Sequence, residues 1–271
     1  EWQNWGAHDA PKLNRLMDYS EPAQKGFKLF LAKHYPDLAE SQAEWPGFQA
    51  RMNRSESVFL PPEGQLLNIA ANRYLSESIA DFMCKLAAAA RTAAGPDLLL
   101  AVYYGYAFEY GNLAWNVNLS GHNALEKILN SSDINLIVSP PSYGVRNLGD
   151  CGEDMKPFAS IRAAGKLSLN DDDTRTHLTP ATGFYQTVTA RQTEQILRRN
   201  MGRTLCRMEP LCLLPLNGGN EFNSPEIIRD LQRFKQVSAF AVTLPVANRA
   251  EIAVVVSERA NAVLAFEKRQ I

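Results

Sequence analysis

The chain has 271 residues, which is enough for one large domain or two smaller ones. Its 28 basic residues almost balance its 29 acidic residues, and 45% of its side chains are hydrophobic, a composition typical of globular proteins. The basic residues are scattered, so we expect no nucleic-acid partner. No stretch reaches the roughly 20 apolar residues of a membrane span, so we expect no membrane partner.

The four cysteines lack the spacing of a metal site or a redox pair. Cys84, Cys151, Cys206 and Cys212 form no C-x-x-C pair, and none lies beside a histidine in a zinc-like pattern. We therefore expect buried free thiols and no metal site, with one disulfide left open as an alternative. The chain begins at Glu1 without a methionine or an apolar leader, so we expect the natural start to lie upstream, and the compartment stays unknown.

Apolar residues at helical spacing predict two helices in the first third of the chain. The first runs from Pro22 to Tyr35, and a longer one begins at Gly64 and is ended by Gly95-Pro96. Residues 40–63 are expected to form an irregular connection. The expected apolar face of the long helix carries Leu67, Ala70 or Ala71, Tyr74, Ile79, Phe82, Met83 and Leu86.

From residue 98 onward, short apolar runs alternate with helical patterns. The expected strands are residues 98–103, 134–138, 167–169 and 212–216. Helices are expected around Leu125, after a capping box at Thr189, and after Ser224-Pro225. This alternation predicts an α/β fold with a parallel sheet, either doubly wound or a barrel.

Two further features bear on cofactor and domain organisation. No glycine-rich nucleotide motif follows any expected strand, and we expect no cofactor. After Pro245, the apolar run at 250–257 predicts a buried strand that begins a new unit. We therefore place a domain boundary between residues 244 and 245.

The end of the strand at 167–169 carries the densest set of reactive side chains. Asp171, Asp172 and Asp173 follow within four residues, and Arg175 and His177 come directly after them. Strand ends are where α/β enzymes carry their chemistry. The alternative is a solvated acidic turn, with Arg175 and His177 in a structural ion pair rather than in contact with a substrate.

Other strand ends carry aromatic and acidic side chains. Glu1 lies beside Trp2 and near Trp5, which suits either a sugar-stacking platform or core packing. Tyr104, Tyr106 and Glu109 follow one strand and Tyr143 follows the next, and these tyrosines are candidates for a pocket or for packed core. His122 is expected at a helix start.

In this order, the strand ends resemble the second half of the catalytic barrel in glycoside hydrolases of the clan that includes the family-42 β-galactosidases. The closest resemblance is to the group with a barrel followed by a flavodoxin-like trimerisation domain. The residues that carry it are Tyr104-Gly105-Tyr106, Glu109, Ser120-Gly121-His122-Asn123-Ala124-Leu125, Ser131-Ser132-Asp133-Ile134, Ser139-Pro140-Pro141-Ser142-Tyr143, Gly165-Lys166-Leu167, Asp173-Thr174-Arg175-Thr176-His177-Leu178 and Ala250-Glu251-Ile252-Ala253-Val254-Val255-Val256.

The resemblance implies that residues 1–244 are the C-terminal part, strands 4 to 8, of a (β/α)8 TIM barrel. Residues 245–271 would then start the flavodoxin-like domain, and the complete protein would be a homotrimer. The first three barrel strands are expected to be absent from this chain. Such a fragment should expose sheet edges, because every strand of a barrel has two neighbours.

The resemblance also implies a retaining hydrolysis of β-galactosides or related glycosides, with an oligosaccharide or glycoside as partner. Such enzymes use an acid/base and a nucleophile about 5 to 5.5 Å apart. Glu1 matches the acid/base, and Asp171 matches the nucleophile, where relatives have glutamate. The implied substrate-binding residues are Trp2, Trp5, Tyr104, Tyr106, Glu109, Tyr143, Arg175 and His177.

Departures from the family pattern leave two alternatives open. Asp171 is one methylene shorter than glutamate, and misplacement of a reacting group by about 1 Å can cost about a hundredfold in rate. Relatives have aromatic residues where this chain has Ser168-Leu169 and in the last barrel strand. The alternatives are a catalytically impaired carbohydrate-binding relative and a metal site of the D-x-D type in the acidic triplet.

Overall fold

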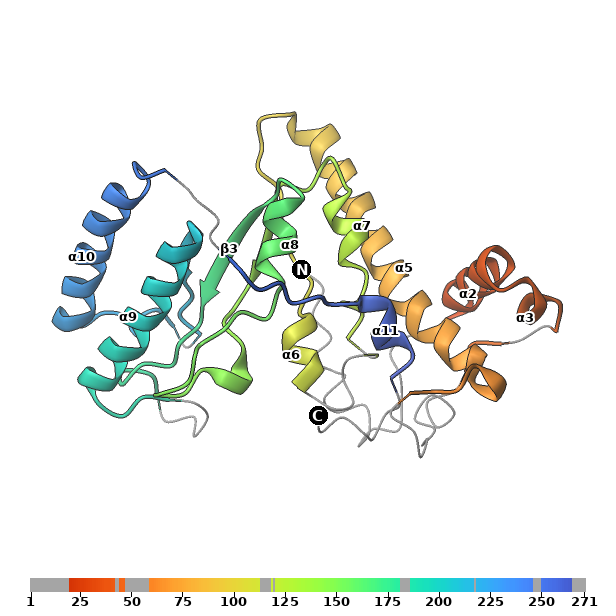
Figure 1. Cartoon of the computed structure of the whole chain (residues 1–271). Coiled ribbons are helices and arrows are strands. Elements are labelled where there is room, and N and C mark those ends of the chain that lie inside the picture. Colours follow the sequence, from red (N-terminus) through yellow and green to blue (C-terminus); the bar gives the residue numbers. More distant parts are fainter. Residues whose placement is uncertain are drawn as a thin grey trace. The chain divides into compact units, whose positions relative to one another are not determined.

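The computed structural model describes residues 20–41, 44–46, 59–112, 118, 120–180, 186–216, 218–245 and 250–264 (Figure 1). Glu1, Trp2 and Trp5 lie outside the described residues, so their expected roles stay predictions. The described strands and helices alternate along the chain, which confirms the α/β class. The chain divides into two compact units: unit 1 comprises Glu1–Asn135 and Val256–Ile271, and unit 2 comprises Leu136–Val255.

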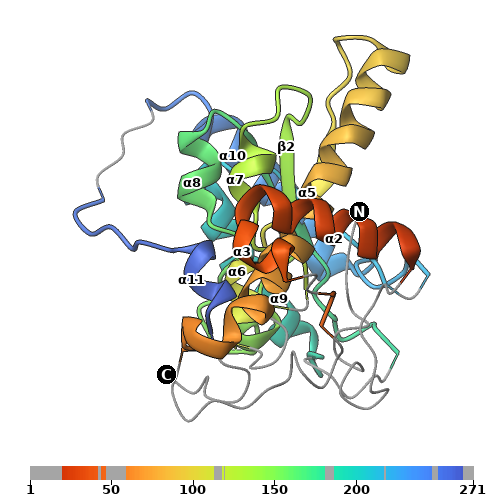
Figure 2. The same cartoon turned by 90° about the vertical axis from the view of Figure 1, so that its right-hand side faces the viewer.

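Unit 1 is built around one long helix. Its described elements are α2 (Glu21–His34), α3 (Pro36–Glu40), α5 (Pro62–Ala94), β1 (Ala101–Tyr103), α6 (Ala107–Asn112), α7 (Leu125–Leu129) and α11 (Glu258–Ala262). Helix α2 packs against α5, as Figure 2 shows, and the expected helix from Pro22 to Tyr35 is confirmed. Regular helix in α5 begins after Gly64, at φ 77°, and stops at Gly95, at φ 87°, as the sequence predicts.

The buried face of α5 matches the expected one only in part: Ile79 and Met83 are buried as expected. Phe82 and Leu86 are more than half exposed, whereas the polar residues Asn72 and Ser76 are buried. The reason is hydrogen bonding: the Asn72 side-chain amide donates to the Ala262 carbonyl oxygen at 2.9 Å, and the Ser76 hydroxyl accepts from the Asn123 N–H at 3.3 Å. A helical pattern of apolar residues does not reveal such satisfied polar positions.

The strand β1 is shorter than the sequence predicts. Leu98 and Leu99 are exposed and precede the strand. The Arg91 guanidinium donates to the carbonyl oxygens of Pro96 at 2.9 Å and Leu98 at 2.5 Å, and it also reaches the Asn135 side chain. These bonds hold residues 95–98 in the turn that follows α5, which delays the start of the strand.

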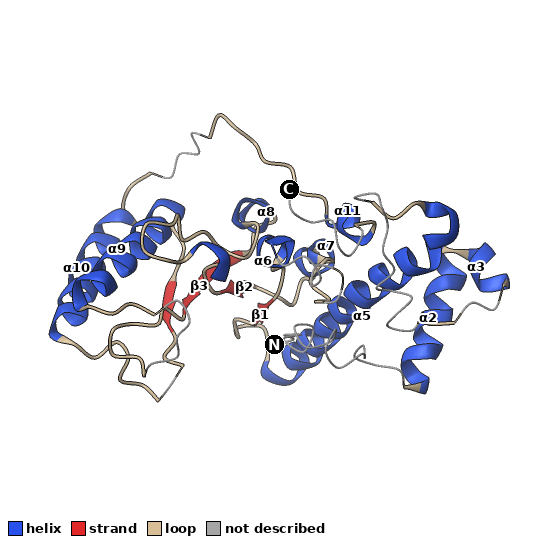
Figure 3. Cartoon of the chain, turned by 90° about the horizontal axis from the view of Figure 1, so that it is seen from below, coloured by secondary structure: helices blue, strands red, loops and turns tan. Residues whose placement is uncertain are grey.

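Unit 2 is a parallel sheet with helices. Its described elements are β2 (Leu136–Ser139), η2 (Tyr143–Val145), α8 (Phe158–Ala163), β3 (Leu167–Asp172), α9 (Ala190–Arg207), β4 (Leu211–Leu213) and α10 (Pro225–Ala241). Strands β2, β3 and β4 pair in parallel in that order. Helices α9 and α10 lie side by side (Figures 1 and 3), and Leu197, Met201 and Ile227 form the core between them and the sheet residue Leu213.

The helix starts of unit 2 follow the sequence signals. The Thr189 hydroxyl accepts from the Gln192 N–H, and the Gln192 side chain accepts from the Thr189 N–H, which confirms the capping box. Ser224 caps α10, with Pro225 at its first position. Both caps satisfy backbone donors that the first helical turn leaves unpaired.

The expected buried strand at 250–257 is not formed. Residues 250–257 contain no strand, and Ile252, Val254 and Val255 are 85%, 83% and 91% exposed. The apolar run pairs with no strand among the described residues, so its β propensity is not realised. The domain boundary between residues 244 and 245 stays a prediction.

Candidate functional site

One face of β3 is polar and points at partners from other elements. Because side chains alternate along a strand, Ser168, Asn170 and Asp172 share a face. The Ser168 hydroxyl donates to Glu209 Oε1 at 2.5 Å, and the Asn170 side-chain amide donates to Asp154 Oδ1 at 2.6 Å. This face is therefore committed to internal hydrogen bonds.

Asp172 closes the turn that leaves β3. Its Oδ1 accepts from the backbone N–H of Thr174 at 3.0 Å and from the Thr174 hydroxyl at 2.5 Å. Its Oδ2 accepts from the side-chain amide of Asn200 on α9 at 2.7 Å. The carboxylate is fully buried, and these contacts are those of a structural residue.

Asp173 is held by a tyrosine and an arginine. The Tyr143 hydroxyl donates to Asp173 Oδ2 at 2.7 Å, and Arg146 Nη1 donates to Oδ1 at 2.7 Å. The Arg146 guanidinium also lies 3.8 Å from the centroid of the Tyr143 ring. Burial and the neighbouring Asp173 carboxylate raise the pKa of Tyr143, so its hydroxyl keeps its proton and remains the donor.

Asp171 lies on the other face of β3 from Asp172. It pairs in register with Cys212 of β4, so the two side chains share a face of the sheet. Burial, followed by the charge and hydrogen bond of Asp171, raises the pKa of the Cys212 thiol. Asp171 is 3% exposed, whereas Cys212 is exposed.

Arg175 and His177 lie in the chain that follows the triplet. The Arg175 guanidinium is 5.9 Å from the Tyr143 ring centroid. The backbone carbonyl oxygen of Arg175 accepts from the Thr187 N–H at 3.0 Å. The His177 ring Nδ1 lies 2.9 Å from the Thr193 hydroxyl on α9. The structure thus gathers Tyr143, Asp173 and Arg175, and it ties His177 to the helix.

Asn200 and Arg199 anchor this region from α9, and neither is among the site residues predicted from the sequence. Arg199 donates to the carbonyl oxygens of Arg146, Asn147 and Asp150, which fixes the loop that carries Arg146. The signal was available: Thr193, Asn200 and Thr204 interrupt the inward stripe of Ile196, Leu197 and Met201 at helical spacing. Buried polar residues in such a stripe need partners.

A buried ionic cluster lies behind the polar face of β3. Lys156 Nζ is 2.9 Å from Glu209 Oε1 and 3.8 Å from Asp154 Oδ2, and all three side chains are almost fully buried. Arg203 and Arg207 contact Asp154 at 2.9 and 2.7 Å. The cluster is enclosed, so we assign it to the fold rather than to chemistry.

Tyr104, Tyr106 and Glu109 belong to unit 1 and are buried. The Tyr104 hydroxyl donates to the Gly121 carbonyl oxygen at 2.8 Å, and both tyrosine rings stack on His122, with centroids 4.9 and 4.5 Å away. These contacts favour the packing alternative for the two tyrosines. Substrate contact by the three residues stays a prediction.

His122 does not begin a helix, in contrast to the expectation. Helix α7 starts at Leu125, and His122 lies between two tyrosine rings, where its Nδ1 accepts from the Gly105 N–H at 3.1 Å. Gly105 has φ 82°, and a Cβ there would come within 3.0 Å of the Leu125 side chain. Glycine is therefore required between Tyr104 and Tyr106.

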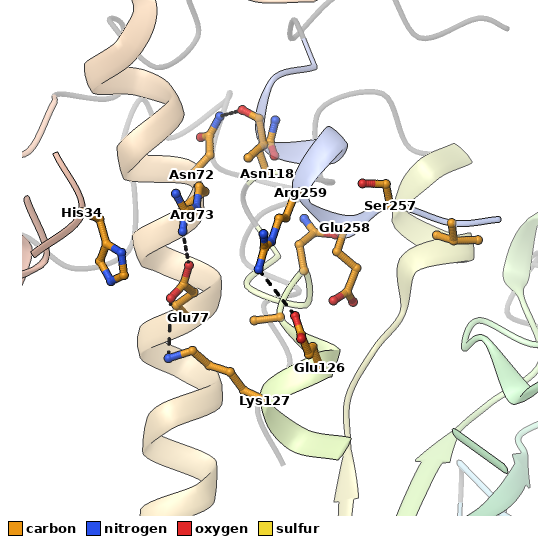
Figure 4. A pocket seen from close by; sticks show the side chains of 14 residues that line it. His34, Asn72, Arg73, Glu77, Asn118, Glu126, Lys127, Ser257, Glu258 and Arg259 are labelled. Carbon is orange, nitrogen blue, oxygen red and sulfur yellow. Dashed lines mark hydrogen bonds and ion pairs between the residues drawn. The ribbon is translucent and has the colours of Figure 1, made fainter. Parts of the chain in front are cut away.

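Unit 1 also contains a polar cavity of about 430 Å³, shown in Figure 4. Its charged residues pair with one another: Glu77 lies 3.0 Å from Arg73 and 3.5 Å from Lys127, and Arg259 lies 3.8 Å from Glu126. Its described lining contains no tyrosine, tryptophan or phenylalanine. It therefore lacks the aromatic face on which sugar rings commonly stack.

Glu258 is the unusual acid of this cavity. Its Oε2 accepts from the Leu125 N–H at 2.8 Å, while its buried Oε1 has no hydrogen-bond partner among the residues that the structure describes. Burial raises the pKa of this carboxyl to about 7. Glu258 therefore changes charge near neutral pH.

The cysteines form no disulfide, and the described acidic and histidine side chains form no metal site. All four cysteines are free, as expected, but Cys151, Cys206 and Cys212 are exposed rather than buried. Within the described ranges, no group of three or more His, Cys, Asp or Glu residues could hold a metal ion. Asp173 already has a guanidinium at 2.7 Å, which a cation would have to displace.

No helix in the described part of the chain is long and apolar enough to cross a membrane.

Comparison with known proteins adds no assignment: no family model, no curated protein and no solved structure matches the chain. The site is thus defined by its own geometry. It is the Asp171 carboxylate near the C-terminal end of a parallel strand in an α/β protein, followed by two carboxylates, Asp172 and Asp173, that the fold holds.

Proposed function

We propose that the chain is a retaining glycoside hydrolase that cleaves β-galactosides or related glycosides, with Asp171 as nucleophile and Glu1 as acid/base. In this reaction the acid protonates the leaving-group oxygen and the nucleophile attacks the anomeric carbon, giving a glycosyl-enzyme that water then hydrolyses. The supporting observation is that Asn200 and Thr174 hold Asp172, and Tyr143 and Arg146 hold Asp173. The side chains of Asp171 and Asp172 lie on opposite faces of β3.

We also propose the finer fold that the resemblance implies. Strands β1 to β4 would be strands 5 to 8 of a (β/α)8 barrel, and residues 245–271 would start a trimerisation domain. The parallel pairing of β2, β3 and β4 and the helices after β3 and β4 are compatible with this assignment. In this assignment, the residues that contact the substrate would be Trp2, Trp5, Tyr143, Arg175 and His177.

Hydrolysis of aryl β-glycosides by variants at position 171 tests the proposal. Asp171→Asn removes the nucleophile and should abolish turnover, whereas Asp171→Glu restores the missing methylene and should retain or raise it. Asp97→Asn, at an exposed carboxylate after Gly95-Pro96, is the matched control and should behave as wild type. Full activity in Asp171→Asn would contradict the assignment.

A second candidate is a carbohydrate-binding protein of the same fold without turnover. It is favoured by the 3% exposure of Asp171 and by its shorter side chain. Calorimetry with galacto-oligosaccharides would then show saturable binding while no aryl glycoside is hydrolysed. Turnover that depends on Asp171 would exclude this candidate.

A further inference from the structure

Asn200 is a buried amide in the inward face of α9. It is 1% exposed, and its neighbours on that face, Leu197 and Met201, are apolar core residues. A buried amide is costly unless it is hydrogen-bonded. Its Nδ2 donates to Asp172 Oδ2 at 2.7 Å and lies 3.3 Å from the Thr174 hydroxyl, so helix and strand end are joined through this one side chain.

The same contacts fix the direction in which the chain leaves β3. The other oxygen of Asp172 accepts from the Thr174 N–H and hydroxyl, which closes the turn. Asp171 is the residue directly before this closure, and it is paired in register with Cys212 on β4. The strand pairing and the Asn200 contact therefore hold the backbone of Asp171 from both sides.

We infer that Asn200 is a positioning residue for Asp171: through Asp172 and Thr174 it fixes the end of β3, and thereby keeps the Asp171 carboxylate beside Cys212. The consequence for catalysis rests on the proposed function. An aspartate has little reach of its own, so its reactive position depends on the backbone that Asn200 holds. A shift of about 1 Å at a reacting group can cost about a hundredfold in rate.

Cys212 is a built-in reporter of the Asp171 carboxylate. A nearby negative charge disfavours the thiolate, so loss or displacement of the carboxylate should lower the pKa of Cys212. The rate of alkylation by iodoacetamide, resolved by peptide mass spectrometry across pH in the full chain, measures this change. The exposed thiols of Cys151 and Cys206 serve as internal references in the same sample.

Asp171→Asn sets the scale of the effect and should speed alkylation of Cys212 several-fold near neutral pH. Asn200→Ala should produce a shift in the same direction, with Cys151 and Cys206 unchanged. If Asn200→Ala leaves Cys212 at the wild-type rate, or if Asp171→Asn does not shift it, the inference is wrong. Equal acceleration of all three thiols would indicate general unfolding and would also contradict a local positioning role.

A swapped pair keeps the test informative if Asn200→Ala folds poorly. In the double variant Asp172→Asn with Asn200→Asp, the amide and carboxylate exchange places, and the amide oxygen introduced at position 172 can still accept from Thr174. The swap should return Cys212 to the wild-type rate, whereas Asn200→Asp alone sets two carboxylates against each other and should not. Failure of the swap to restore the rate would contradict the inference.

The outcomes for the inference and the proposed function are separable. The Cys212 rate requires no turnover, so it reports on Asn200 even if Asp171 is not a nucleophile. If turnover is present, Asn200→Ala should lower kcat with little change in KM, because it displaces the reacting group rather than the substrate-binding residues.

Discussion

At the scale of single residues, Arg146 is the group on which the Tyr143 and Asp173 arrangement depends. Its guanidinium contacts Asp173 at 2.7 Å, stacks on Tyr143, and donates to the Pro141 carbonyl oxygen. Arg146 and Asp173 are 5% and 3% exposed. Removing one member of a buried ion pair leaves the other charge buried without a partner. This destabilises a protein more than replacing both members with apolar residues does.

We therefore expect Arg146→Ala to destabilise the protein by roughly 3 to 5 kcal/mol, as is usual for breaking a buried pair. Urea denaturation measures the loss. Arg259→Ala is the matched control, since Arg259 is 83% exposed and 3.8 Å from Glu126, and it should change stability little. Equal effects of the two substitutions would contradict the importance of burial.

Glu258 provides a pH-dependent contact at the same scale. Its pKa in the folded chain, about 7, is raised above the ordinary value of 4.5, so the folded state favours the protonated form. The stabilising contribution is complete below about pH 4.5 and is lost as the pH rises from there to about 7, with a magnitude on the order of 3 kcal/mol. Opposing the charged form are burial and, more weakly, Glu126.

Glu258→Gln should remove this pH dependence, because the neutral amide still accepts from the Leu125 N–H. Thermal unfolding between pH 5 and 8 should show wild type losing stability relative to Glu258→Gln as the pH rises. Parallel curves for the two proteins would show that Glu258 does not titrate in this range.

At the scale of elements, the polar face of β3 and the buried Lys156 cluster tie strand and helix together. Lys156 contacts Glu209, Asp154 and the Ser139 hydroxyl, and its side chain is completely buried. Lys156→Met should lower the free energy of unfolding by about 3 to 5 kcal/mol, because it takes the Lys156 ammonium away from the buried Glu209 carboxylate, whereas Asp154 keeps Arg203 and Arg207. Lys85→Met on the exposed side of α5 is the control and should be nearly neutral, as denaturant titration would show.

Local signals carried most of the element predictions. The caps at Thr189 and Ser224 and the glycine stop at Gly95 depend on neighbours within a few residues, so a sequence shows them directly. The burial of Asn72 and Ser76 on α5 depends on partners that are distant in the sequence, and no periodicity indicates it. Asn200 is the intermediate case. The sequence shows it as a polar residue in an apolar helical stripe, but it does not show which residue is its partner.

At the scale of the whole molecule, the candidate site was predictable in part. The sequence placed Asp171 at a strand end and placed Tyr143 and Arg175 near it, but it could not separate the three aspartates by partner. That separation follows from strand alternation and from Asn200 and Arg146, which come from other elements. The strand expected at Ile252 failed because a strand needs a neighbour, which composition does not supply.

The exposed run around Ile252 has a consequence for behaviour in solution. Ile252, Val254 and Val255 form a β-branched segment without proline or glycine, which favours self-association when exposed. Val254→Lys together with Val255→Glu should raise the monomer fraction measured by size-exclusion chromatography with light scattering. An unchanged elution profile and mass would show that this segment does not drive association.

Covalent trapping of a glycosyl-enzyme distinguishes Asp171 from the other carboxylates as the proposed nucleophile. A 2-deoxy-2-fluoro β-galactoside with a good leaving group, incubated with the protein, should form a glycosyl ester that survives to peptide mapping. We expect one added sugar on Asp171, absent from Asp171→Asn. A sugar on Asp172, Asp173 or another residue, or turnover with no label at all, would contradict it.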